Sequence, residues 1–399
     1  MHEKVVIVTD GPAWPDRRIM RTVEVLRGLD CRIAIIDHGD HPEETRLHYG
    51  EDVTYYPMYL PGRGLAGLVW HAANRLTPLS SWKARAKYVT HVLENEKPDI
   101  VHCINVFYLE PCARYACDTH AKLVYEPYET WREHIFSSEY NIPQRLAARF
   151  AHAEESCSKK SDTIICVSPA QIEYYPDHAK REEVHIVLNT PNNETLVEDI
   201  SEVHSPLRFV HSGNVVENRQ IESFLEGAAE IADMQITVLG NGVYLPQLRN
   251  TVRLNGWNKF VDFRSPVSLR ELKRTLQSYD VGLIGGSAKN VQTDGALGNK
   301  LFDYMSAGLG IVAYRTTALA SFPNIEQFAI LVDEDDAEAL KQVFRELVSN
   351  KARVARMKQA ALAESEKYTD GKQKEVLCKA YCLLLNAQEA DPVSHSSNS

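Results

Sequence analysis

Short β-branched segments alternate with longer helical segments along almost the whole chain, and this alternation constrains the fold more than any other feature. The first series of predicted strands covers residues 4–10, 31–37, 99–105, 122–128, 163–168 and 184–189. Because these segments are nearly continuous in hydrophobicity, they are typical of a parallel sheet that helices cover on both faces. The segments between them, such as residues 17–29 and 147–161, have the pattern of crossover helices.

The alternation restarts after a polar, acidic segment near residue 200. The second series of predicted strands covers residues 207–214, 234–240, 260–265, 281–287, 311–314 and 329–333. We therefore predict an α/β fold with two doubly wound, Rossmann-like domains that face a central cleft. The predicted domains span residues 1–200 and 201–365. A C-terminal helix over residues 366–388 is expected to pack back toward the N-terminal domain, and residues 389–399 are expected to be disordered.

Composition excludes several classes of function. A net charge of -10 argues against a nucleic-acid partner, because phosphate contacts need a basic surface. No apolar run is long enough to span a bilayer, and the N-terminus lacks the pattern of a signal peptide. The eight cysteines form no CxxC pair, which disfavours a zinc site and indicates reduced thiols. We expect a cytoplasmic protein.

Candidate binding residues should follow the carboxyl ends of the strands, where doubly wound folds bind ligands. The residues at such positions are Gly11, Glu129, Gly213, Arg219, Gly240 and Gly242, together with Asp294, Asn299, Lys300 and Asp303 in one loop-to-helix corner. Glycine lets backbone N–H groups approach an anion closely. Asn299 is expected to cap the helix that begins near Lys300.

An ordered set of motifs runs from the first strand to about residue 365. The motifs are PDRR (15–18), KPDIVH (97–102), KLVYEPYE (122–129), DTIICVS (162–168), HSGNVVENR (211–219), ITVLGNG (236–242) and GNKLFDYMSAGLGIVAY (298–314). In order and spacing, this set resembles the GT-B glycosyltransferases of family 4.

The resemblance implies a retaining transfer of a hexosyl or N-acetylhexosaminyl group. The donor would be a nucleoside diphosphate sugar of the UDP or GDP type, and the acceptor a glycan or lipid-linked molecule in cell-surface polysaccharide synthesis. Arg219 and Lys300 would contact the diphosphate, and Asp303 the ribose hydroxyls. Glu129 joins the two cations as a candidate catalytic residue. These cations can neutralise the departing diphosphate, so no metal cofactor is expected.

The sequence departs from the family pattern at several positions. Gly295 replaces a glutamate that faces the donor sugar, and Asp294 is the nearest acid. Tyr128 stands where the family usually has an active-site histidine, and Asp303 is shorter than the usual glutamate. Gly298 and Gly310 replace prolines. Two alternatives therefore stay open: a catalytically silent nucleotide-sugar-binding protein, and a nucleotide-sugar epimerase with the same two-domain plan.

Each candidate residue also has a purely structural explanation. Arg219, Lys300 and Asp303 could be solvated charges of a helix end, and the glycines could be turns. Glu129 could pair with Arg132 one helical turn away. The acidic run at 333–336 contains a D-x-D triplet, but its position before a predicted helix favours an electrostatic role at the helix N-terminus over a metal site.

Residues 53–93 contain no aspartate or glutamate. They carry five basic residues among tryptophans and tyrosines: Arg63, Arg75, Lys83, Arg85 and Lys87. Such a segment could lie on an anionic membrane surface or bind a lipid diphosphate acceptor, which would make the protein a peripheral membrane protein. The alternative is a crossover helix with a solvated basic face.

Overall fold

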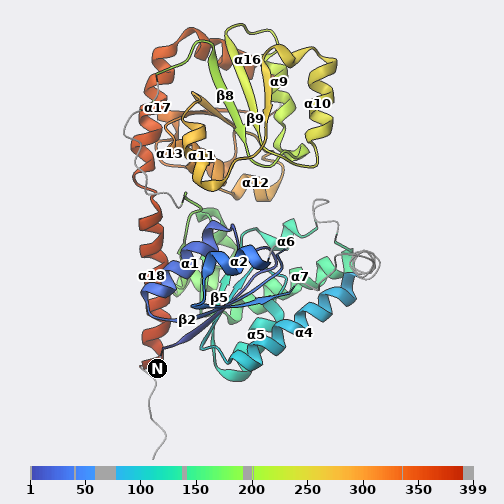
Figure 1. Cartoon of the computed structure of the whole chain (residues 1–399), viewed down its shortest axis with the longest axis vertical. Coiled ribbons are helices and arrows are strands. Elements are labelled where there is room, and N and C mark those ends of the chain that lie inside the picture. Colours follow the sequence, from blue (N-terminus) through green and yellow to red (C-terminus); the bar gives the residue numbers. More distant parts are fainter. Residues whose placement is uncertain are drawn as a thin grey trace, which may run out of the picture. The chain divides into compact units, whose positions relative to one another are not determined.

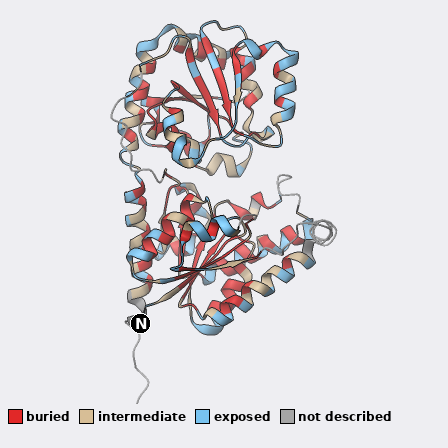
Figure 2. Ribbon diagram, in the orientation of Figure 1, coloured by how far each residue is buried: buried red, intermediate tan, exposed pale blue. Residues whose placement is uncertain are grey.

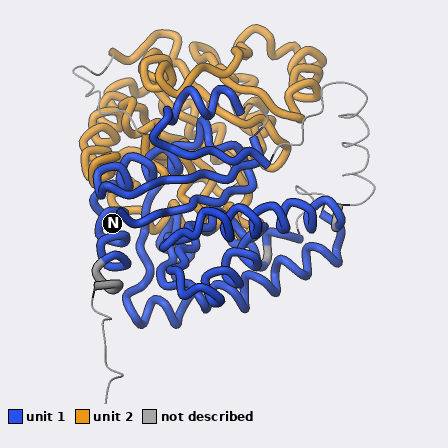
Figure 3. Tube along the Cα trace, turned by 60° about the horizontal axis from the view of Figure 1, so that its bottom comes forward, with its two compact units in different colours: residues 1–188, 373–399 blue, residues 189–372 orange. Residues whose placement is uncertain are grey.

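The computed structural model describes residues 2–39, 42–58, 78–136, 142–191, 200, 202–334 and 336–389 of the chain. It divides the chain into two compact units (Figure 3). The first comprises residues 1–188 and 373–399, and the second residues 189–372. Each unit has its own parallel sheet, so the predicted α/β class with two Rossmann-like sheets is confirmed.

The first unit contains a seven-stranded parallel sheet with the order β3-β2-β1-β4-β5-β6-β7 (Figure 1). Its strands are β1 (Lys4–Val8), β2 (Arg32–Asp37), β3 (Val53–Pro57), β4 (Ile100–Ile104), β5 (Lys122–Glu126), β6 (Thr163–Cys166) and β7 (Val184–Ile186). Because β1 pairs with β4, the loops that follow these two strands are neighbours at the carboxyl edge of the sheet.

Helices pack around this first sheet. They are α1 (Arg17–Gly28), α2 (Pro42–Tyr49), α4 (Pro78–Glu96), α5 (Leu109–Thr119), α6 (Trp131–His134), α7 (Gln144–Cys157), α8 (Pro176–Lys180) and α18 (Asp370–Glu389). Asp16 starts α1, since its carboxylate accepts hydrogen bonds from the backbone N–H groups of Arg18 (2.8 Å) and Ile19 (3.1 Å).

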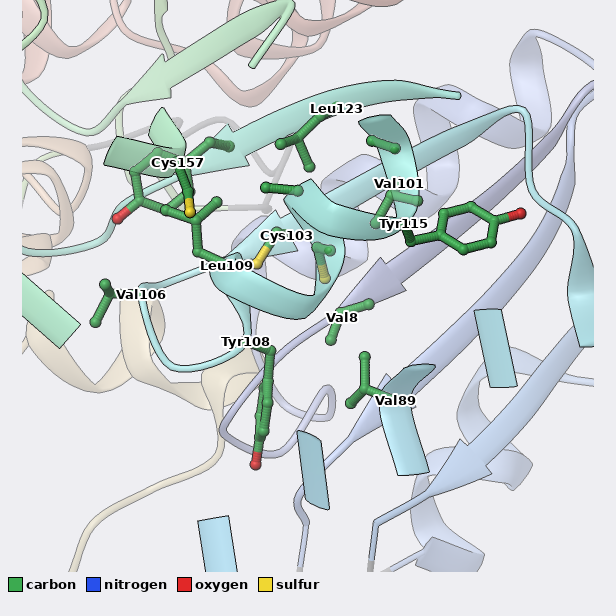
Figure 4. Close-up of a cluster of buried hydrophobic side chains, with 14 of the residues drawn as sticks. Val8, Val89, Val101, Cys103, Val106, Tyr108, Leu109, Tyr115, Leu123 and Cys157 are labelled. Atoms are coloured by element: carbon green, nitrogen blue, oxygen red, sulfur yellow. The ribbon is translucent and has the colours of Figure 1, made fainter. Parts of the chain in front are cut away.

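Alternate side chains of β1 enter different parts of the core, as the pleat of a strand requires. Val6 and Val8 belong to the cluster that contains Leu109 of α5 (Figure 4). Val5 and Ile7 belong to a second cluster that contains Leu377, Tyr381 and Leu384 of α18. The strands of both units are largely buried (Figure 2). Helix α18 is therefore a component of the first unit's core from Gln373 onward.

A buried ionic cluster also joins α18 to the first unit. Glu126, at the end of β5, accepts a hydrogen bond from Arg18 Nε (2.6 Å) and lies 2.8 Å from His102 Nε2. The other ring nitrogen of His102 hydrogen-bonds the Tyr381 hydroxyl of α18 at 2.7 Å. Arg18 also donates to the carbonyl of Val187. This cluster was not predicted from the sequence.

The charge of Glu126 is favoured by its two basic partners. Burial would raise the pKa of this carboxyl, but Arg18 and His102 outweigh burial and lower the pKa to about 2. Glu126 is therefore a carboxylate throughout the physiological pH range. Its contribution to stability is present above the ordinary pKa of a glutamate, about 4.3, and is lost as the pH falls through about 2.

The second unit contains a six-stranded parallel sheet with the order β10-β9-β8-β11-β12-β13. Its strands are β8 (Leu207–Ser212), β9 (Met234–Leu239), β10 (Val261–Arg264), β11 (Val281–Ile284), β12 (Gly310–Tyr314) and β13 (Ala329–Val332). The order reverses between β8 and β11, and this switch point is where doubly wound folds bind ligands.

The second sheet is also packed between helices (Figure 1). They are α9 (Ile221–Ala228), α10 (Leu245–Leu254), α11 (Leu269–Leu276), α12 (Val291–Gly295), α13 (Asn299–Ser306), α14 (Thr317–Ala320), α15 (Ile325–Phe328), α16 (Ala337–Ser349) and α17 (Lys351–Ser365). Phe224 of α9 and Phe344 of α16 belong to one hydrophobic cluster with Phe209 of β8.

Candidate functional site

Three loops at the carboxyl edge of the second sheet pack backbone against backbone. A Cβ atom on Gly240 would lie 1.9 Å from the carbonyl oxygen of Gly213, and one on Gly285 would lie 1.8 Å from the carbonyl oxygen of Arg219. A Cβ on Gly242 would lie 2.2 Å from the carbonyl oxygen of Val215. Only glycine fits at these positions. The loops after β8, β9 and β11 therefore form one compact shelf at the switch point.

This packing explains the predicted glycines individually. Gly213 has φ +100°, which an L side chain rarely adopts, and it is exposed at the end of β8. Gly240 is instead buried against Gly213, so a side chain at position 240 would collide with the backbone of the neighbouring loop. It supports the candidate anion site without lining it.

Arg219 and Lys300 lie at this shelf. A terminal guanidinium nitrogen of Arg219 is 3.7 Å from the Cβ position of Gly286, and the Lys300 side chain comes within 3.7 Å of the Cβ position of Gly213. The pKa of the Lys300 ammonium is lowered to about 7, chiefly by burial and then by the nearby charge of Arg219, while Asp303 opposes the shift. Two cations thus face each other at one edge of the sheet.

Within the described residues, neither Arg219 nor Lys300 forms a salt bridge, and the buried Arg219 Nε has no hydrogen-bond partner. The imidazole of His211 is fully buried next to them, and neither of its ring nitrogens has a hydrogen-bond partner in this part of the structure. Burial lowers the His211 pKa well below its usual value, assisted by Lys300 and Arg219. The arrangement favours an anionic ligand.

The first turn of α13 adds backbone donors to this positive site. Gly298 is the N-cap residue and supplies no side-chain cap, so the N–H groups of the first turn are not satisfied by a cap. Asn299 is the first residue of the helix, and its side-chain oxygen accepts a hydrogen bond from Asn189 Nδ2 at 2.6 Å. The prediction that Asn299 caps the helix is therefore wrong, because the helix begins one residue earlier than expected.

Asp303 lies on the same helix and is 6% exposed. The next residue, Tyr304, anchors α13 to the sheet: its hydroxyl accepts a hydrogen bond from Ser212 N–H at 2.9 Å. Its ring occupies the space beside Gly282, where a Cβ would lie 2.2 Å from the ring. Lys300 and Asp303 are consequently held on a helix that is fixed against β8 and β11.

Asp294 has a structural partner in the second unit. Its carboxylate accepts a hydrogen bond from the backbone N–H of Thr317 at 2.7 Å, in the first turn of α14. This bond holds the α12–α14 connection together. The position that corresponds to the family's glutamate, Gly295, carries no side chain to replace it.

A second polar cluster lies at the carboxyl edge of the first sheet. Asn105, after β4, has φ +61° and donates a hydrogen bond from Nδ2 to Asp10 Oδ1 at 2.8 Å. Its oxygen accepts from the Tyr128 backbone N–H (3.0 Å) and from Trp131 Nε1 (3.1 Å). Gly11, a predicted binding residue, follows Asp10 in the sequence. Its backbone N–H donates a hydrogen bond to the Thr9 hydroxyl at 3.3 Å.

Tyr128 has a structural role at this edge of the first sheet. Its hydroxyl donates to the helix-capping carboxylate of Asp16 at 3.2 Å, and the guanidinium of Arg18 lies 5.4 Å from the centre of its ring. Burial raises the Tyr128 pKa well above its usual value, and Asp16 and Glu126 raise it further. The phenol therefore cannot serve as a proton acceptor near neutral pH.

Glu129 lies next to His134 and not to its expected partner. Glu129 Oε2 is 3.8 Å from the Nε2 atom of His134, which is buried in α6. Arg132 instead donates to the carbonyl of Tyr174 at 3.4 Å. The pairing of Glu129 with Arg132 is not formed, because Arg132 turns toward the chain after β6.

The basic segment at 53–93 has two different parts. Arg63 and Arg75 lie outside the described residues. In α4, Trp82 is buried and donates to the Phe107 carbonyl at 2.7 Å, whereas Lys83 and Lys87 are exposed. Arg85 is half-buried, and its charge lowers the pKa values of Tyr108 and Asp10 against the effect of burial. Helix α4 thus packs on the sheet as a crossover helix, and its N-terminal half exposes Lys83 and Lys87.

Acidic residues of the run at 333–336 form contacts with neighbouring residues. Asp333 pairs with Arg315 at 3.0 Å, and Asp336 caps α16 through the backbone N–H of Ala339 at 2.8 Å. Asp335 lies outside the described residues. Among the residues that the structure describes, no group of three or more His, Cys, Asp or Glu side chains could hold a metal ion. No described helix has both the length and the hydropathy needed to cross a membrane.

Two glycosyltransferase family models match this sequence. The model for the glycosyl transferase 4-like domain matches residues 15–190, and the model for glycosyl transferases group 1 matches residues 206–350. Together they account for most of both units. The chain is a member of the GT-B glycosyltransferases, in the family 4-like group. No curated protein matches the sequence.

Solved structures share the GT-B fold with this glycosyltransferase at low sequence identity. Sucrose-phosphate synthase from Thermosynechococcus elongatus has a TM-score of 0.76 at 12% identity, covering 97% of this chain and 100% of that one. Anabaena HepE, solved with UDP-glucose, has a TM-score of 0.70 at 11% identity, covering 96% and 100%. TarM of S. aureus, solved with Fondaparinux, alpha-GlcNAc-glycerol and UDP, has a TM-score of 0.65 at 10% identity, covering 96% and 100%.

Some residues at these two sheet edges were not predicted from the sequence. His211 lies two residues before Gly213, in the motif that was quoted for the resemblance, and Asp10 directly precedes Gly11. The rule that binding residues follow strands could have found Asp10. Nothing in the sequence shows that His211 is buried beside two cations, because that depends on the loops after β8 and β11 and on α13.

Proposed function

We propose that this glycosyltransferase binds a UDP-type sugar donor in its second unit and transfers the sugar with retention to a glycan or lipid-linked acceptor. The observation that carries the proposal is the pair Arg219 and Lys300, two cations with no salt bridge among the described residues. A diphosphate is the ligand that such a pair fits, because it supplies two adjacent anionic groups. HepE and TarM, which share the fold, were solved with UDP-glucose and UDP.

The same cations would serve the transfer step. Negative charge grows on the diphosphate as the bond to the sugar breaks, and fixed donors at that position stabilise it most when they need no rearrangement. Arg219 presents a planar fork to phosphate oxygens, and Lys300 a point charge. Together with the first-turn N–H groups of α13, which have no side-chain cap, these residues would stabilise the negative charge without a metal ion, so we propose a metal-independent reaction.

Asp303 is proposed to bind the ribose hydroxyls, and its replacement tests the donor site. Asp303→Ala should weaken UDP binding by roughly 1.5–3 kcal/mol, the cost of losing one charged hydrogen-bond acceptor. Pyrophosphate affinity should not change, since pyrophosphate has no ribose. Calorimetry with both ligands measures this, and Asp294→Ala is the matched control on the same corner. Equal UDP affinity in wild type and Asp303→Ala would show that this acid is structural.

The protonation of Lys300 on ligand binding gives a second test of the donor site. At pH 8 an ammonium with a pKa of about 7 is mostly neutral. A bound diphosphate favours the charged form, so UDP should bind with uptake of about one proton, and its affinity should fall as the pH rises above 7. Titration calorimetry in two buffers of different ionisation enthalpy measures the uptake. Lys300→Gln should bind UDP more weakly and take up no proton; equal uptake in this variant would refute the role of Lys300.

A catalytically silent sugar-nucleotide-binding protein is the second candidate. Two observations favour it: Tyr128 is locked by Asp16 and Arg18, and Asp294 is engaged with Thr317. Neither residue can then replace the family's histidine or glutamate without rearrangement. Such a protein would bind UDP as described here and would release no sugar.

We propose further that the protein acts in the cytoplasm, at the surface of an anionic membrane, in polysaccharide synthesis. Lys83 and Lys87 on the exposed side of α4 would each contribute about 1 kcal/mol of attraction to anionic lipid, weakened by salt. Sedimentation with vesicles that contain anionic lipid tests this at low and high salt. Reversing both lysines to glutamate should leave the protein in the supernatant. If wild type does not sediment with these vesicles at low salt, the proposed membrane association is wrong.

A further inference from the structure

Two cysteines of α18 lie one helical turn apart in the first unit. Cys378 and Cys382 are both half-buried, and their Sγ atoms are 3.9 Å apart. Residues four apart in a helix are neighbours on one face, so the backbone of α18 holds the two thiols side by side. Neither thiol belongs to the proposed donor site or to the ionic cluster at Glu126, and nothing in the proposed reaction uses them.

A disulfide does not fit this pair. Side chains four residues apart in a helix have Cβ atoms about 5–6 Å apart, whereas a disulfide needs a Cβ separation of about 3.8 Å. A direct bond between the two sulfurs would therefore require this turn of α18 to open. The Cys378 thiol is also weakly reactive toward oxidants, because its pKa is raised, chiefly by burial and then by the Cys382 thiol beside it.

The separation of the sulfur atoms matches that of two thiolates on one metal ion. Two ligands at a metal–sulfur distance of about 2.3 Å are about 3.8 Å apart in tetrahedral geometry and about 4.6 Å apart in linear geometry. The observed 3.9 Å agrees with the tetrahedral value. We infer that Cys378 and Cys382 bind a thiophilic divalent ion as neighbouring ligands in tetrahedral geometry. Binding breaks two S–H bonds, forms two metal–sulfur bonds and releases two protons to solvent.

The site offers two protein ligands and leaves two positions open. Among the described residues, no third His, Cys, Asp or Glu side chain converges with the pair. Water or a small-molecule thiol fills the open positions, so the ion exchanges with solvent, unlike one in a closed four-ligand site. Thiolates select soft ions over Mg²⁺ and Ca²⁺, which prefer oxygen ligands. Lys374, one turn before Cys378, pairs with Glu24 of α1 at 2.6 Å, so its charge is balanced next to the bound cation.

An ion at this position fixes the turn that attaches α18 to the first unit. Tyr381 precedes Cys382, is fully buried, and hydrogen-bonds His102 at 2.7 Å. Cys378 packs against the same hydrophobic cluster that contains Leu377 and Tyr381. Because the folded helix presents both thiols together and the unfolded chain does not, the ion binds the folded protein more tightly and should stabilise it. This inference does not depend on the proposed function.

The experiment titrates the full chain with Cd²⁺, in a buffer with a phosphine reductant and no free thiol. The ultraviolet charge-transfer band from sulfur to cadmium measures binding, and wild type should bind one ion that excess Mg²⁺ does not displace. Cys378→Ser and Cys382→Ser should each weaken binding about a hundredfold or more, because each sulfur holds the ion close to the other. The controls Cys117→Ser, which removes an exposed thiol, and Cys31→Ser, which removes a half-buried one, should bind as wild type does.

Thermal unfolding of the same proteins gives an independent readout. Saturating Cd²⁺ should raise the Tm of wild type and leave that of the double variant Cys378→Ser/Cys382→Ser unchanged, and circular dichroism without metal checks that each variant is folded. Four results would overturn the inference. They are no charge-transfer band in wild type, an equal band in the double variant, loss of the band in either control, and displacement of the ion by Mg²⁺.

Discussion

Glu126→Ala should lower the free energy of unfolding by about 3–5 kcal/mol, the largest effect on stability that we expect from any single substitution in the first unit. The substitution leaves the Arg18 guanidinium buried without its counter-charge and removes the carboxylate that lies beside His102. Breaking a buried pair in this way costs much more than the pair itself contributes, because the remaining charge stays desolvated. Urea unfolding followed by circular dichroism measures the loss.

The matched control is an ion pair at the surface of the same unit. Glu110 forms a two-point contact with Arg149, at 2.8 and 3.0 Å, in a solvated position. Glu110→Ala should cost no more than about 1 kcal/mol. Tyr381→Phe should weaken the attachment of α18 by removing the hydroxyl that bonds His102. Comparable losses for Glu126→Ala and Glu110→Ala would mean that the buried cluster does not hold the unit together.

Arg219→Ala should lower kcat by about 10²–10³-fold, the range seen when one fixed donor to a developing anion is removed. The expected loss is large because Arg219 is held by the close packing of its carbonyl on Gly285, and Lys300 alone carries less than a full charge near pH 7. Arg219→Lys should recover only part of the rate, since it restores the charge without the planar fork.

The control for this variant is Arg315→Ala, which removes an exposed guanidinium of the second unit that pairs with Asp333. It should leave kcat unchanged. UDP should also stabilise wild type by about 2.7 kcal/mol at a hundredfold excess over its dissociation constant, and Arg219→Ala should lose most of this gain. Full activity in Arg219→Ala would show that the diphosphate does not bind at this position.

The sheets could be predicted from the sequence because their strands are buried on both faces. Each predicted strand corresponds to one in the structure. Strand β3 was missed, because it lies at the edge of the sheet and its residues from Tyr55 to Pro57 are only half-buried, so its hydrophobic pattern is weak. The division between the units falls after Leu188, where the polar segment begins, and not near residue 200.

The second-unit site could be predicted in part, since Arg219, Lys300 and Asp303 lie in motifs with fixed spacing. The roles of their neighbours depend on contacts between distant segments. Asp294 bonds to Thr317 and Gly240 packs on Gly213, and neither contact follows from local pattern. The ionic cluster at Glu126 was missed for the same reason, because Arg18, His102, Glu126 and Tyr381 come from four separate elements.

The most direct measurement is NMR of the products formed from single sugar nucleotides. The protein is incubated with UDP-glucose, UDP-galactose, UDP-N-acetylglucosamine or GDP-mannose, with and without methyl glycosides as acceptors. We expect release of the nucleoside diphosphate together with a new glycoside that has the anomeric configuration of the donor. Isomerised donor without nucleotide release would identify an epimerase, binding without any reaction would identify a silent protein, and either result would contradict the account.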